Sequence, residues 1–478
     1  MDAQRMLGDV VQQTLVGAGQ WFTSRRWFGD KSRSIGSIRP RVGRAIEIHG
    51  GWLWFVHVEF TFLDGDSATY FVPVLTSPSR QQGQPIGEAN VDGDRWHISD
   101  ALDSTVVREW FLGRAAASAV VEDLDGAWRW RTFGDGSVQL GEALKLPSRV
   151  LGGEQSNTSI RYGETIIAKV FRRLQPGISP DVEIGAFLRT RTDFVHSPEM
   201  YGTAEWHDDC LWSIASFQSF QANTGDGWTW LLDELQAEGA SIPESTLKAL
   251  ATLGQRTAEL HLALASAVED EAFRPEPYDH ASLSSDIAQL HDEVALTLSM
   301  VAAHNVEVAD ILLAQSRLSS ETDALLALAD TSRIRIHGDY HLGQVLRTND
   351  EDFSILDFEG EPARPIEQRR QKSSALRDVA GMLRSLDYAL AFIDKQDPAR
   401  VGQTRRAEWS RMLRSAFLSG YTRTVFATPQ TIVPIHQAEF SAALRALEIQ
   451  KALYEVRYEL DNRPDWVSIP LAALGLNG

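Results

Sequence analysis

The chain has 478 residues, of which 43% are hydrophobic and 23% are charged, a balance that is typical of folded globular proteins and excludes a disordered chain. The formal net charge is −19, which disfavours binding to nucleic acid and to anionic lipid. Because no apolar run of about 18 residues or signal peptide is found and Cys210 is the single cysteine, we expect a cytoplasmic protein. The length predicts two or three domains.

The first part of the chain begins with a short helical pattern and then shows three alternating runs, "RAIEIHG", "WLWFVHVEFTF" and "TYFVPVLT". Gly and Asp turns separate these runs, so they predict a small antiparallel sheet of hairpins. The stretch 76–94 is rich in Gly, Pro and polar residues and predicts a linker. We therefore expect an N-terminal cap domain over residues 1–92.

The next part, residues 93–225, mixes strands and helices. A helix is expected near 100–112, strands at 127–133 and 138–143, and three further strands within 149–174. Residues 181–191 follow a Pro- and Gly-containing break and predict a helix with acidic residues in its first turn. We therefore expect a second, β-rich lobe over residues 93–225.

From residue 226 to 478 the hydrophobic period is mostly that of helices, most clearly at 245–266, 286–304 and 374–393. The exception is the strand-like stretch "RIRIHGDYHLGQVLRTNDEDFSILDFEGEPA", which is embedded among these helices. The whole pattern predicts an α+β, two-lobed fold, in which a β-rich cap precedes a β-rich lobe and a helical lobe.

The embedded stretch carries the clearest candidate chemistry. Asp339 follows the strand-like "RIRI", Gln344 comes five residues later, and Asp357 ends "FSILDF", so strand pairing would bring them together. One carboxylate can accept a proton from an attacking hydroxyl, while an amide oxygen and the other carboxylate bind Mg²⁺. That combination is what phosphoryl transfer requires. The alternative is that these residues only form turns on a solvated hairpin.

A second group supplies what a nucleotide would need. Small and hydroxyl-bearing residues in "GGEQSNTSIRYGETIIAKVFRR" can present backbone N–H groups to phosphates, and Lys169 lies in a strand-like run where its ammonium can meet them. Glu183, in the following helix, can pair with Lys169. The loop does not match the P-loop pattern, and a plain hairpin turn with a surface Lys–Glu pair is the alternative interpretation.

Taken together, these motifs resemble the maltokinases, a branch of the aminoglycoside-phosphotransferase-like kinases with a protein-kinase-like fold. The resemblance rests on "RRWFGDKSR", "EQSNTSIRYGETIIAKVFR", "SPDVEIGAFL", "IHGDYHLGQVLRT", "DFEGEPARP", "LRDVAGMLRSLDYA" and "KALYEVRYELDNRPDW". These motifs extend from near the start of the chain almost to its end. The resemblance implies an ATP- and Mg²⁺-dependent sugar kinase.

The resemblance also implies roles for individual residues. Asp339 would be the catalytic base, Gln344 and Asp357 the magnesium ligands, and Lys169 with its partner Glu183 would bind phosphate. The phosphate loop and the adenine-binding hinge at 215–223 would contribute the other nucleotide-binding residues, namely Ser156, Asn157, Thr158, Ser159, Gln218 and Phe220. The acceptor sugar would meet His341, Glu359, Glu361, Gln450, Tyr454, Glu455, Asp461 and Arg463.

The acceptor is open between two sugars. Gln450 stands where maltokinases generally carry an acidic residue, and this departure argues against a pocket built for maltose. Some maltokinase-like proteins phosphorylate glucosamine, a cationic sugar that an acidic pocket attracts by roughly 1 kcal/mol per exposed pair, and Asp461 could contribute to such a pocket. We therefore place glucosamine, giving glucosamine 6-phosphate, ahead of maltose, giving maltose 1-phosphate.

Other classes of protein remain as alternatives. A non-catalytic nucleotide- or sugar-binding regulator is disfavoured because Asp339, Asp357 and Lys169 are all present. A kinase for an aminoglycoside or a choline-like amine is disfavoured by the cap and by the "NRPDW" tail, and a protein kinase by the lack of a D-F-G and A-P-E pair. The oligomeric state is left open, and a monomer is compatible with the sequence.

Overall fold

The structure is a computed structural model that describes residues 2–81, 83–152, 156–237, 241–304, 311–362, 364–396 and 402–476. The chain divides into two compact units. The first consists of Met1–Thr190, Pro198–Gln221 and Pro365–Glu367, and the second of Arg191–Ser197, Ala222–Arg364 and Gln368–Gly478. None of the described helices is long and apolar enough to cross a membrane.

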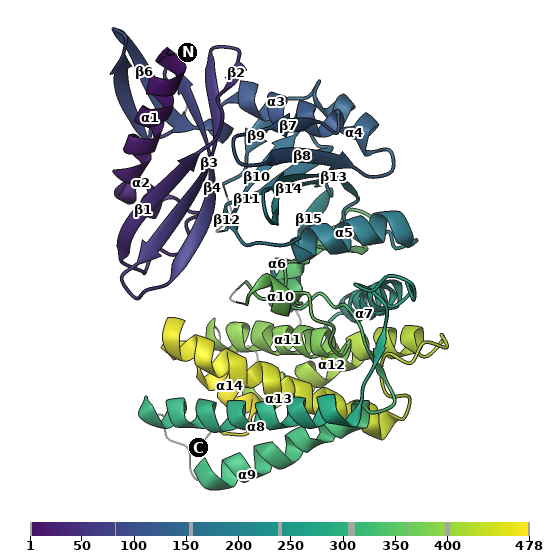
Figure 1. Cartoon of the computed structure of the whole chain (residues 1–478). Helices are drawn as coiled ribbons and strands as arrows, with labels where there is room; N and C mark the ends of the chain where they lie inside the picture. Colours follow the sequence, from purple (N-terminus) through teal and green to yellow (C-terminus); the bar gives the residue numbers. More distant parts are fainter. Residues whose placement is uncertain are drawn as a thin grey trace. The chain divides into compact units, whose positions relative to one another are not determined.

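The first unit opens with an antiparallel sheet (Figure 1), in the order β1-β3-β4-β6-β5, with β2 beside β3 and β12 beside β4. The bounds of its described strands are Ile35–Val42 (β1), Ile46–Ile48 (β2), Gly51–Phe62 (β3), Ser67–Ser77 (β4), Gly87–Val91 (β5), Asp94–Asp100 (β6) and Arg173–Leu174 (β12). The strands predicted from the three alternating runs are β2, β3 and β4, which confirms the hairpins expected there.

This sheet is buried on both faces at its centre. Along β3, Phe55 packs into one hydrophobic core and its neighbours Trp54 and Val56 into another. Because successive side chains of a strand point to opposite faces, burial on both faces requires the nearly continuous apolar run of the sequence. Helices α1 (Asp2–Val16) and α2 (Gly19–Ser24) contribute Leu7, Val11 and Phe22 to the second core.

The second sheet of this unit has the order β7-β8-β13-β14-β11-β10-β9 and is antiparallel throughout. Its described strands are Val120–Glu122 (β7), Ala127–Thr132 (β8), Ser148–Val150 (β9), Asn157–Tyr162 (β10), Ile166–Phe171 (β11), Met200–His207 (β13) and Leu211–Ser219 (β14). The associated helices are Thr105–Ala116 (α3), Gly136–Ala143 (α4) and Pro180–Arg191 (α5), with a 3₁₀ turn at Ala101–Asp103 (η1).

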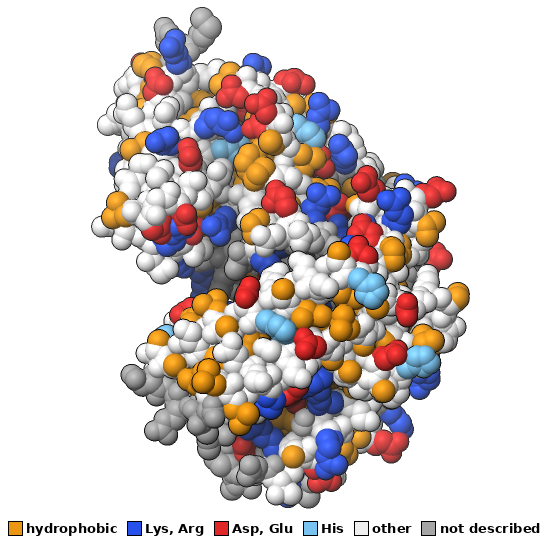
Figure 2. Space-filling model, turned by 60° about the horizontal axis from the view of Figure 1, so that its bottom comes forward, with side chains coloured by type: hydrophobic (Ala, Val, Ile, Leu, Met, Phe, Trp, Pro, Cys, Tyr) orange, Lys and Arg blue, Asp and Glu red, His pale blue; other side chains and the backbone are white. Residues whose placement is uncertain are grey.

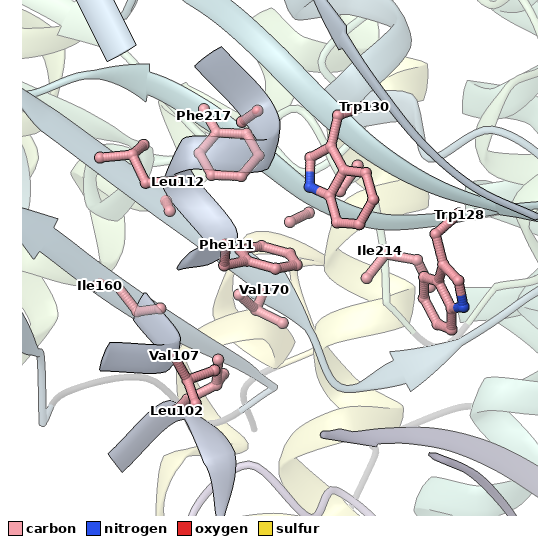
Figure 3. Close-up of a cluster of buried hydrophobic side chains, with 14 of the residues drawn as sticks. Leu102, Val107, Phe111, Leu112, Trp128, Trp130, Ile160, Val170, Ile214 and Phe217 are labelled. Atoms are coloured by element: carbon pink, nitrogen blue, oxygen red, sulfur yellow. The ribbon is translucent and has the colours of Figure 1, made fainter. Parts of the chain in front are cut away.

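Aromatic side chains fill the core between α3 and the two sheets of this unit. Figure 3 shows Phe111 of α3 near Trp130 of β8, and their ring centroids lie 5.8 Å apart in an edge-to-face arrangement. Phe217 of β14 stacks at a tilt on Phe111, with 5.7 Å between centroids. Burial of such large rings contributes on the order of 2 kcal/mol each, so this core holds α3 against the sheet that carries Lys169.

Two expectations differ from the structure in this unit. Residues 138–143 were predicted as a strand but lie in α4, where Leu140 and Ala143 are buried one helical turn apart. A short apolar run fits both the helical period of 3.6 residues and the strand period of two, so the sequence pattern alone does not distinguish a helix from a strand here. In addition, the predicted domain boundary at residue 92 falls between β5 and β6, which pair with each other in one sheet.

The second unit is mostly helical. Its described helices are Gly227–Gln236 (α6), Glu244–Leu264 (α7), His280–Ala303 (α8), Ile311–Thr322 (α9), Leu376–Gln396 (α11), Gly402–Val425 (α12), Gln437–Asn462 (α13) and Ser468–Ala473 (α14); α10 (Ile366–Arg369) lies where the chain passes between units. Short 3₁₀ helices occur at Asp323–Leu328 (η2), Leu342–Gln344 (η3) and Pro464–Trp466 (η4). Helices α7, α8 and α11 confirm the three clearest helical predictions.

The helices of this unit pack closely around two central members, α13 and α11. Helix α13 packs against α8, α9 and α11, while α12 packs along α7. The α7–α12 contact is close because Gly254 and Gly420 face backbone of the opposite helix, where a Cβ on either would overlap a carbonyl oxygen. Helices α7 and α12 therefore form a closely packed pair within the second unit.

Small antiparallel sheets complete the second unit. Strands β15 (Asn223–Asp226), β18 (Val345–Thr348) and β19 (Phe353–Ile355) form one, and β16 (Glu276–Pro277) pairs with β17 (Ser332–Arg333). The strand-like "RIRI" is therefore a strand only at its start.

On the face shown in Figure 2, acidic and basic side chains are interspersed, with small groups of hydrophobic side chains between them.

Candidate active site

The backbone just before Asp339 is held by a buried carboxylate. Asp378, near the start of α11, accepts hydrogen bonds from the N–H groups of His337 at 2.7 Å and Gly338 at 2.9 Å. Gly338 has a φ of +84°, a conformation that L side chains rarely adopt. The loop therefore depends on a glycine and a buried acceptor, and together they determine where the Asp339 side chain begins.

Asp378 is in turn supported by two residues from other helices. His261 of α7 lies 3.1 Å from it through Nε2, and the hydroxyl of Tyr421 in α12 lies 2.9 Å from His261 Nδ1. Burial by itself raises the pKa of Asp378, but the hydrogen bond and charge of His261, with His337 and the backbone donors, outweigh it and leave the pKa below its ordinary value. A charged Asp378 is the form that anchors the loop.

Asp339 borders a narrow cavity within the second unit, whose lining includes Glu361, Gln450 and Tyr454. The ammonium of Lys451 lies 3.6 Å from Asp339 Oδ1 and 5.0 Å from the centre of the Tyr454 ring. Burial, followed by the negative charges of Glu361 and Asp339, raises the pKa of Tyr454 to about 12. Its phenol is therefore a neutral hydrogen-bonding group beside the carboxylate.

The hairpin β18–β19 brings the two candidate magnesium ligands together. His341 Nδ1 accepts a hydrogen bond from Gly343 N–H at 3.0 Å and so caps η3, which ends at Gln344. Leu356 N–H donates to the Gln344 carbonyl at 2.9 Å, and Asp357 follows with a φ of +64°. A non-glycine residue at positive φ is uncommon and occurs at functional sites, because the surrounding structure must compensate its cost.

Gln344 and Asp357 are suitable ligands for a magnesium ion whose other coordination positions are filled by phosphate oxygens and water. Both side chains offer oxygen donors, the type that Mg²⁺ prefers, and it usually takes one or two carboxylates from the protein. Within the described ranges no three His, Cys, Asp or Glu side chains gather in a metal-binding group. One amide oxygen and one carboxylate leave the other coordination positions of such an ion to phosphate oxygens and water.

In the first unit, Lys169 lies on β11, paired with Ser159 of β10 on one side and Ser216 of β14 on the other. Its ammonium is 3.9 Å from Asp181 Oδ2, a carboxylate in the first turn of α5 that is only 1% exposed. Glu183, the predicted partner, lies in the same turn. Sequence reasoning did not select Asp181, although the adjacent acids of "PDVE" were the available signal.

The residues of the predicted phosphate loop have different surroundings. Ser156 precedes β10, whereas Asn157, Thr158 and Ser159 are buried strand residues. The Thr158 hydroxyl accepts a hydrogen bond from Arg172 Nε at 2.8 Å. Residues 153–155, the part of the glycine-rich stretch just before Ser156, lie outside the described residues.

The predicted hinge, 215–223, contains the place where the chain passes from the first unit to the second, between Gln221 and Ala222. Gln218 Nε2 lies 3.5 Å from Asp181 Oδ2, and Phe220 N–H donates to the Thr165 carbonyl at 2.7 Å. Phe220 also lies under the guanidinium of Arg161. A nucleotide-binding role for Gln218 and Phe220 stays a prediction.

The structure brings together only part of the predicted acceptor site. Glu361, Gln450 and Tyr454 line the cavity beside Asp339, as described. The remaining five do not appear among its described lining residues: His341, Glu359, Glu455, Asp461 and Arg463.

Other interactions involve four of these five residues, three of them through the side chain. His341 caps η3, the Glu359 carbonyl accepts from Arg369, and the Glu455 carboxylate accepts from Arg384 at 3.0 and 2.7 Å. Arg463 pairs with Glu459 at 2.7 Å. For Asp461, an exposed residue near the end of α13, the structure gives no link to the cavity. An acceptor-binding role for these five residues stays a prediction.

Several lining residues were not predicted. Besides Lys451, the cavity presents Arg364, Arg377 and Arg457 as well as the carboxylates of Glu293 and Asp378. All of these residues except Glu293 lie inside the motifs on which the resemblance rests, so a signal was present in the sequence. They come from α8, α11, α13 and the segment before α10, and only tertiary packing brings them to one place.

No family model matches the chain. A glucosamine kinase of Mycolicibacterium smegmatis is 28% identical to it over 393 residues, which are 75% of this chain and 92% of that protein. A glucosamine kinase of Streptacidiphilus jiangxiensis is 29% identical over 326 residues, which are 66% of this chain and 70% of that protein.

A solved structure covers almost the whole chain. It is a glucosamine kinase in complex with glucosamine, ADP and inorganic phosphate, and it superposes with a TM-score of 0.68 at 22% identity over 97% of this chain and 98% of that one. This similarity confirms the predicted α+β kinase fold class. The chain therefore has the fold of that glucosamine kinase.

Proposed function

We propose that the chain is an ATP- and Mg²⁺-dependent sugar kinase that transfers the γ-phosphate to glucosamine and forms glucosamine 6-phosphate. The placement of Asp339 carries this proposal. Asp339 borders a polar cavity, and Asp378 holds the backbone of the two residues before it. A general base needs such a fixed position to accept a proton from a bound hydroxyl.

In this mechanism Asp339 accepts the proton of the attacking sugar hydroxyl as its oxygen bonds to the γ-phosphorus of ATP, while the bond from that phosphorus to the β–γ bridging oxygen breaks and ADP leaves. Lys451, 3.6 Å from Asp339, keeps a positive charge beside the carboxylate while the acceptor binds. The neutral Tyr454 phenol and the Gln450 amide supply donors and acceptors for sugar hydroxyls, which require paired hydrogen bonds when they leave water.

The first unit would bind the nucleotide. We assign phosphate binding to Lys169 with Asp181 and Glu183 as the acids of its partner helix, and to the backbone around Ser156. Gln344 and Asp357 would hold Mg²⁺, which neutralises charge on the transferring phosphoryl group when it is bound. We assign adenine contact to the hinge at 215–223.

The comparisons support glucosamine rather than maltose. Two curated relatives and the solved structure described above are glucosamine kinases, and maltose finds no support among them. The regulator alternative gains no support either. Cytoplasmic localisation and the absence of nucleic-acid and membrane partners also remain our proposals.

The deciding experiment is ADP release by the purified protein with MgATP and, in parallel, glucosamine, maltose, glucose or no sugar, followed by phosphorus NMR of the product. Glucosamine-dependent turnover with a 6-phosphate resonance is the expected result. Maltose-dependent turnover that yields a 1-phosphate would replace glucosamine by maltose, and ADP release that is independent of every sugar would contradict the kinase assignment.

A further inference from the structure

A second cavity, of about 370 Å³, lies within the second unit and shares part of its lining with the narrow cavity beside Asp339. The shared residues include Glu361, Arg364, Arg377 and Gln450. Its volume is in the range of small-molecule binding sites. None of the roles assigned above to the sugar acceptor or to the nucleotide uses the part of this cavity that is not shared.

The lining of this cavity is basic, although the chain is acidic as a whole. The basic side chains that line it are Arg333, Arg364, Arg369, Lys372 and Arg377, and the acidic ones are Asp286 and Glu361. Positive charge is therefore in local excess here, in a chain whose net charge is −19. A concave site with low-dielectric walls concentrates such a field, so this cavity attracts anions.

Most of these cations are fixed in place by protein acceptors. Lys372 Nζ donates to Glu276 Oε1 and to the Glu271 carbonyl, each at 2.7 Å, and Arg333 lies 3.5 Å from Glu276 Oε2. Arg364 pairs with Glu361. Because these contacts restrict the side chains before any ligand arrives, ordering them costs little conformational entropy on binding.

Arg377, at the start of α11, is different. Among the described residues its guanidinium has no side-chain hydrogen bond and no ion pair within 4.0 Å, yet it lines both cavities. Burial lowers the pKa of Arg377, and the nearby charge of Arg364 lowers it further. An anion placed against Arg377 and Arg364 would offset the repulsion between their positive charges, and guanidinium groups match the geometry of phosphate oxygens.

The rest of the polar lining is neutral and suits hydroxyl groups. It includes the amides of Gln289, Gln368, Gln371 and Gln450 and the hydroxyl of Ser373. Amides both donate and accept, as sugar hydroxyls do. A ligand that combines one strongly anionic group with several hydroxyls therefore fits the chemistry of the cavity.

We propose that this basic cavity binds a phosphorylated sugar, with the phosphate on Arg377 and Arg364 and the hydroxyls on the surrounding amides. Because Arg364, Arg377 and Gln450 also line the cavity beside Asp339, a sugar phosphate bound here competes with the acceptor sugar. The inference goes beyond the proposed kinase activity and does not depend on it, since it concerns binding alone.

The test is isothermal titration calorimetry on the full chain in saturating MgADP, which occupies the phosphate-binding region of the nucleotide site. Glucosamine 6-phosphate, glucose 6-phosphate, glucosamine and inorganic phosphate are titrated separately. We expect a sugar phosphate to bind more tightly than its parent sugar and than inorganic phosphate, with an affinity that falls as salt rises.

Two variants locate the site. Arg377→Gln should weaken sugar-phosphate binding about tenfold, and Lys372→Gln, which changes a residue that lines only the larger cavity, should also weaken it. Arg445→Gln is the matched control, because Arg445 pairs with Glu321 at 3.1 Å outside both cavities. Thermal melting of each variant checks that it is folded.

Unchanged sugar-phosphate affinity in both Arg377→Gln and Lys372→Gln would overturn the proposal. So would inorganic phosphate binding as tightly as the sugar phosphates, since the site would then recognise an anion without a sugar. Absence of turnover with glucosamine, while sugar-phosphate binding and its loss in the variants persist, would contradict only the proposed kinase activity.

Discussion

Asp339 is the residue on which the proposed chemistry depends most directly. A positively charged group, the ammonium of Lys451, and an uncharged group, the phenol of Tyr454, lie near its carboxylate. Its backbone position is decided elsewhere, by the buried Asp378. Substitutions at Asp339 itself should therefore change the chemical step and leave the loop in place.

We expect Asp339→Asn to reduce turnover by about 10²–10⁴-fold, because the amide cannot accept the proton of the acceptor hydroxyl. MgATP affinity, measured by calorimetry, should be nearly unchanged. Asp330→Asn is the matched control, since Asp330 is an exposed carboxylate outside both cavities, and it should retain full activity. Near-normal turnover of Asp339→Asn would remove Asp339 from the role of base.

Asp357→Ala tests the metal assignment at the same scale. Without this carboxylate only Gln344 remains of the proposed pair, so the gain in nucleotide affinity on adding Mg²⁺ should fall by about tenfold or more. The measurement is ADP binding with and without Mg²⁺. Asp350→Ala, in the exposed turn of the same hairpin, should keep the magnesium effect, and an undiminished effect in Asp357→Ala would contradict its role as ligand.

At the scale of elements, the packing of the two sheets of the first unit depends on a buried histidine. His57 of β3 stacks on Trp128 of β8 with 5.5 Å between ring centroids and 2° between planes. Its Nε2 has no hydrogen-bond partner among the described residues, and burial, followed by the charge of Arg41, lowers its pKa to about 4. The folded first unit therefore holds His57 neutral.

This burial predicts a loss of stability in acid. Between pH values of about 6.5 and 4 the unfolded chain binds a proton at His57 that the folded chain does not, so the free energy of unfolding falls as pH falls through that window. The loss approaches about 3 kcal/mol at pH 4. Thermal melting from pH 7 to 4 should show a smaller acid shift for His57→Phe, which keeps the stack.

The control for this experiment is His49→Phe at an exposed turn, which should melt in parallel with the unsubstituted chain over the whole pH range. If His57→Phe loses as much stability in acid as the unsubstituted chain does, another group is responsible for the acid sensitivity.

At the scale of the whole molecule, the groups assigned to nucleotide and to acceptor belong to different compact units. Lys169, Asp181 and the hinge up to Gln221 are in the first unit, and Asp339 and its cavity are in the second. Phosphoryl transfer requires both ligands in one place with water excluded, which enzymes of this kind achieve by conformational closure. Binding of one ligand should therefore favour binding of the other.

We predict that saturating MgADP lowers the Kd of glucosamine about 5-fold or more, and that glucosamine lowers the Kd of MgADP by the same factor, as linkage requires. Calorimetry in both orders measures the coupling. Lys248→Gln, which removes only an exposed Lys–Glu pair at the start of α7, should leave the coupling intact. Equal affinities with and without the other ligand would show that the two units act independently.

The sequence by itself was sufficient for the features that depend on short-range patterns. The hairpins of the first sheet and the helices α7, α8 and α11 follow from local hydrophobic period, and the pairing of β18 with β19 confirmed the hairpin between Gln344 and Asp357. The order of motifs indicated kinase chemistry before any packing was known. These inferences hold because the period and the motif are properties of contiguous residues.

The tertiary structure alone decided which side chains meet. It placed Asp181 against Lys169, made Asp378 the anchor of the loop before Asp339, and turned Glu455 to Arg384 instead of the cavity. It also gathered Arg333, Lys372 and Arg377 into one basic cavity. These residues are distant in sequence, and the contacts that join them arise from helix packing, which leaves no periodic signal in the chain.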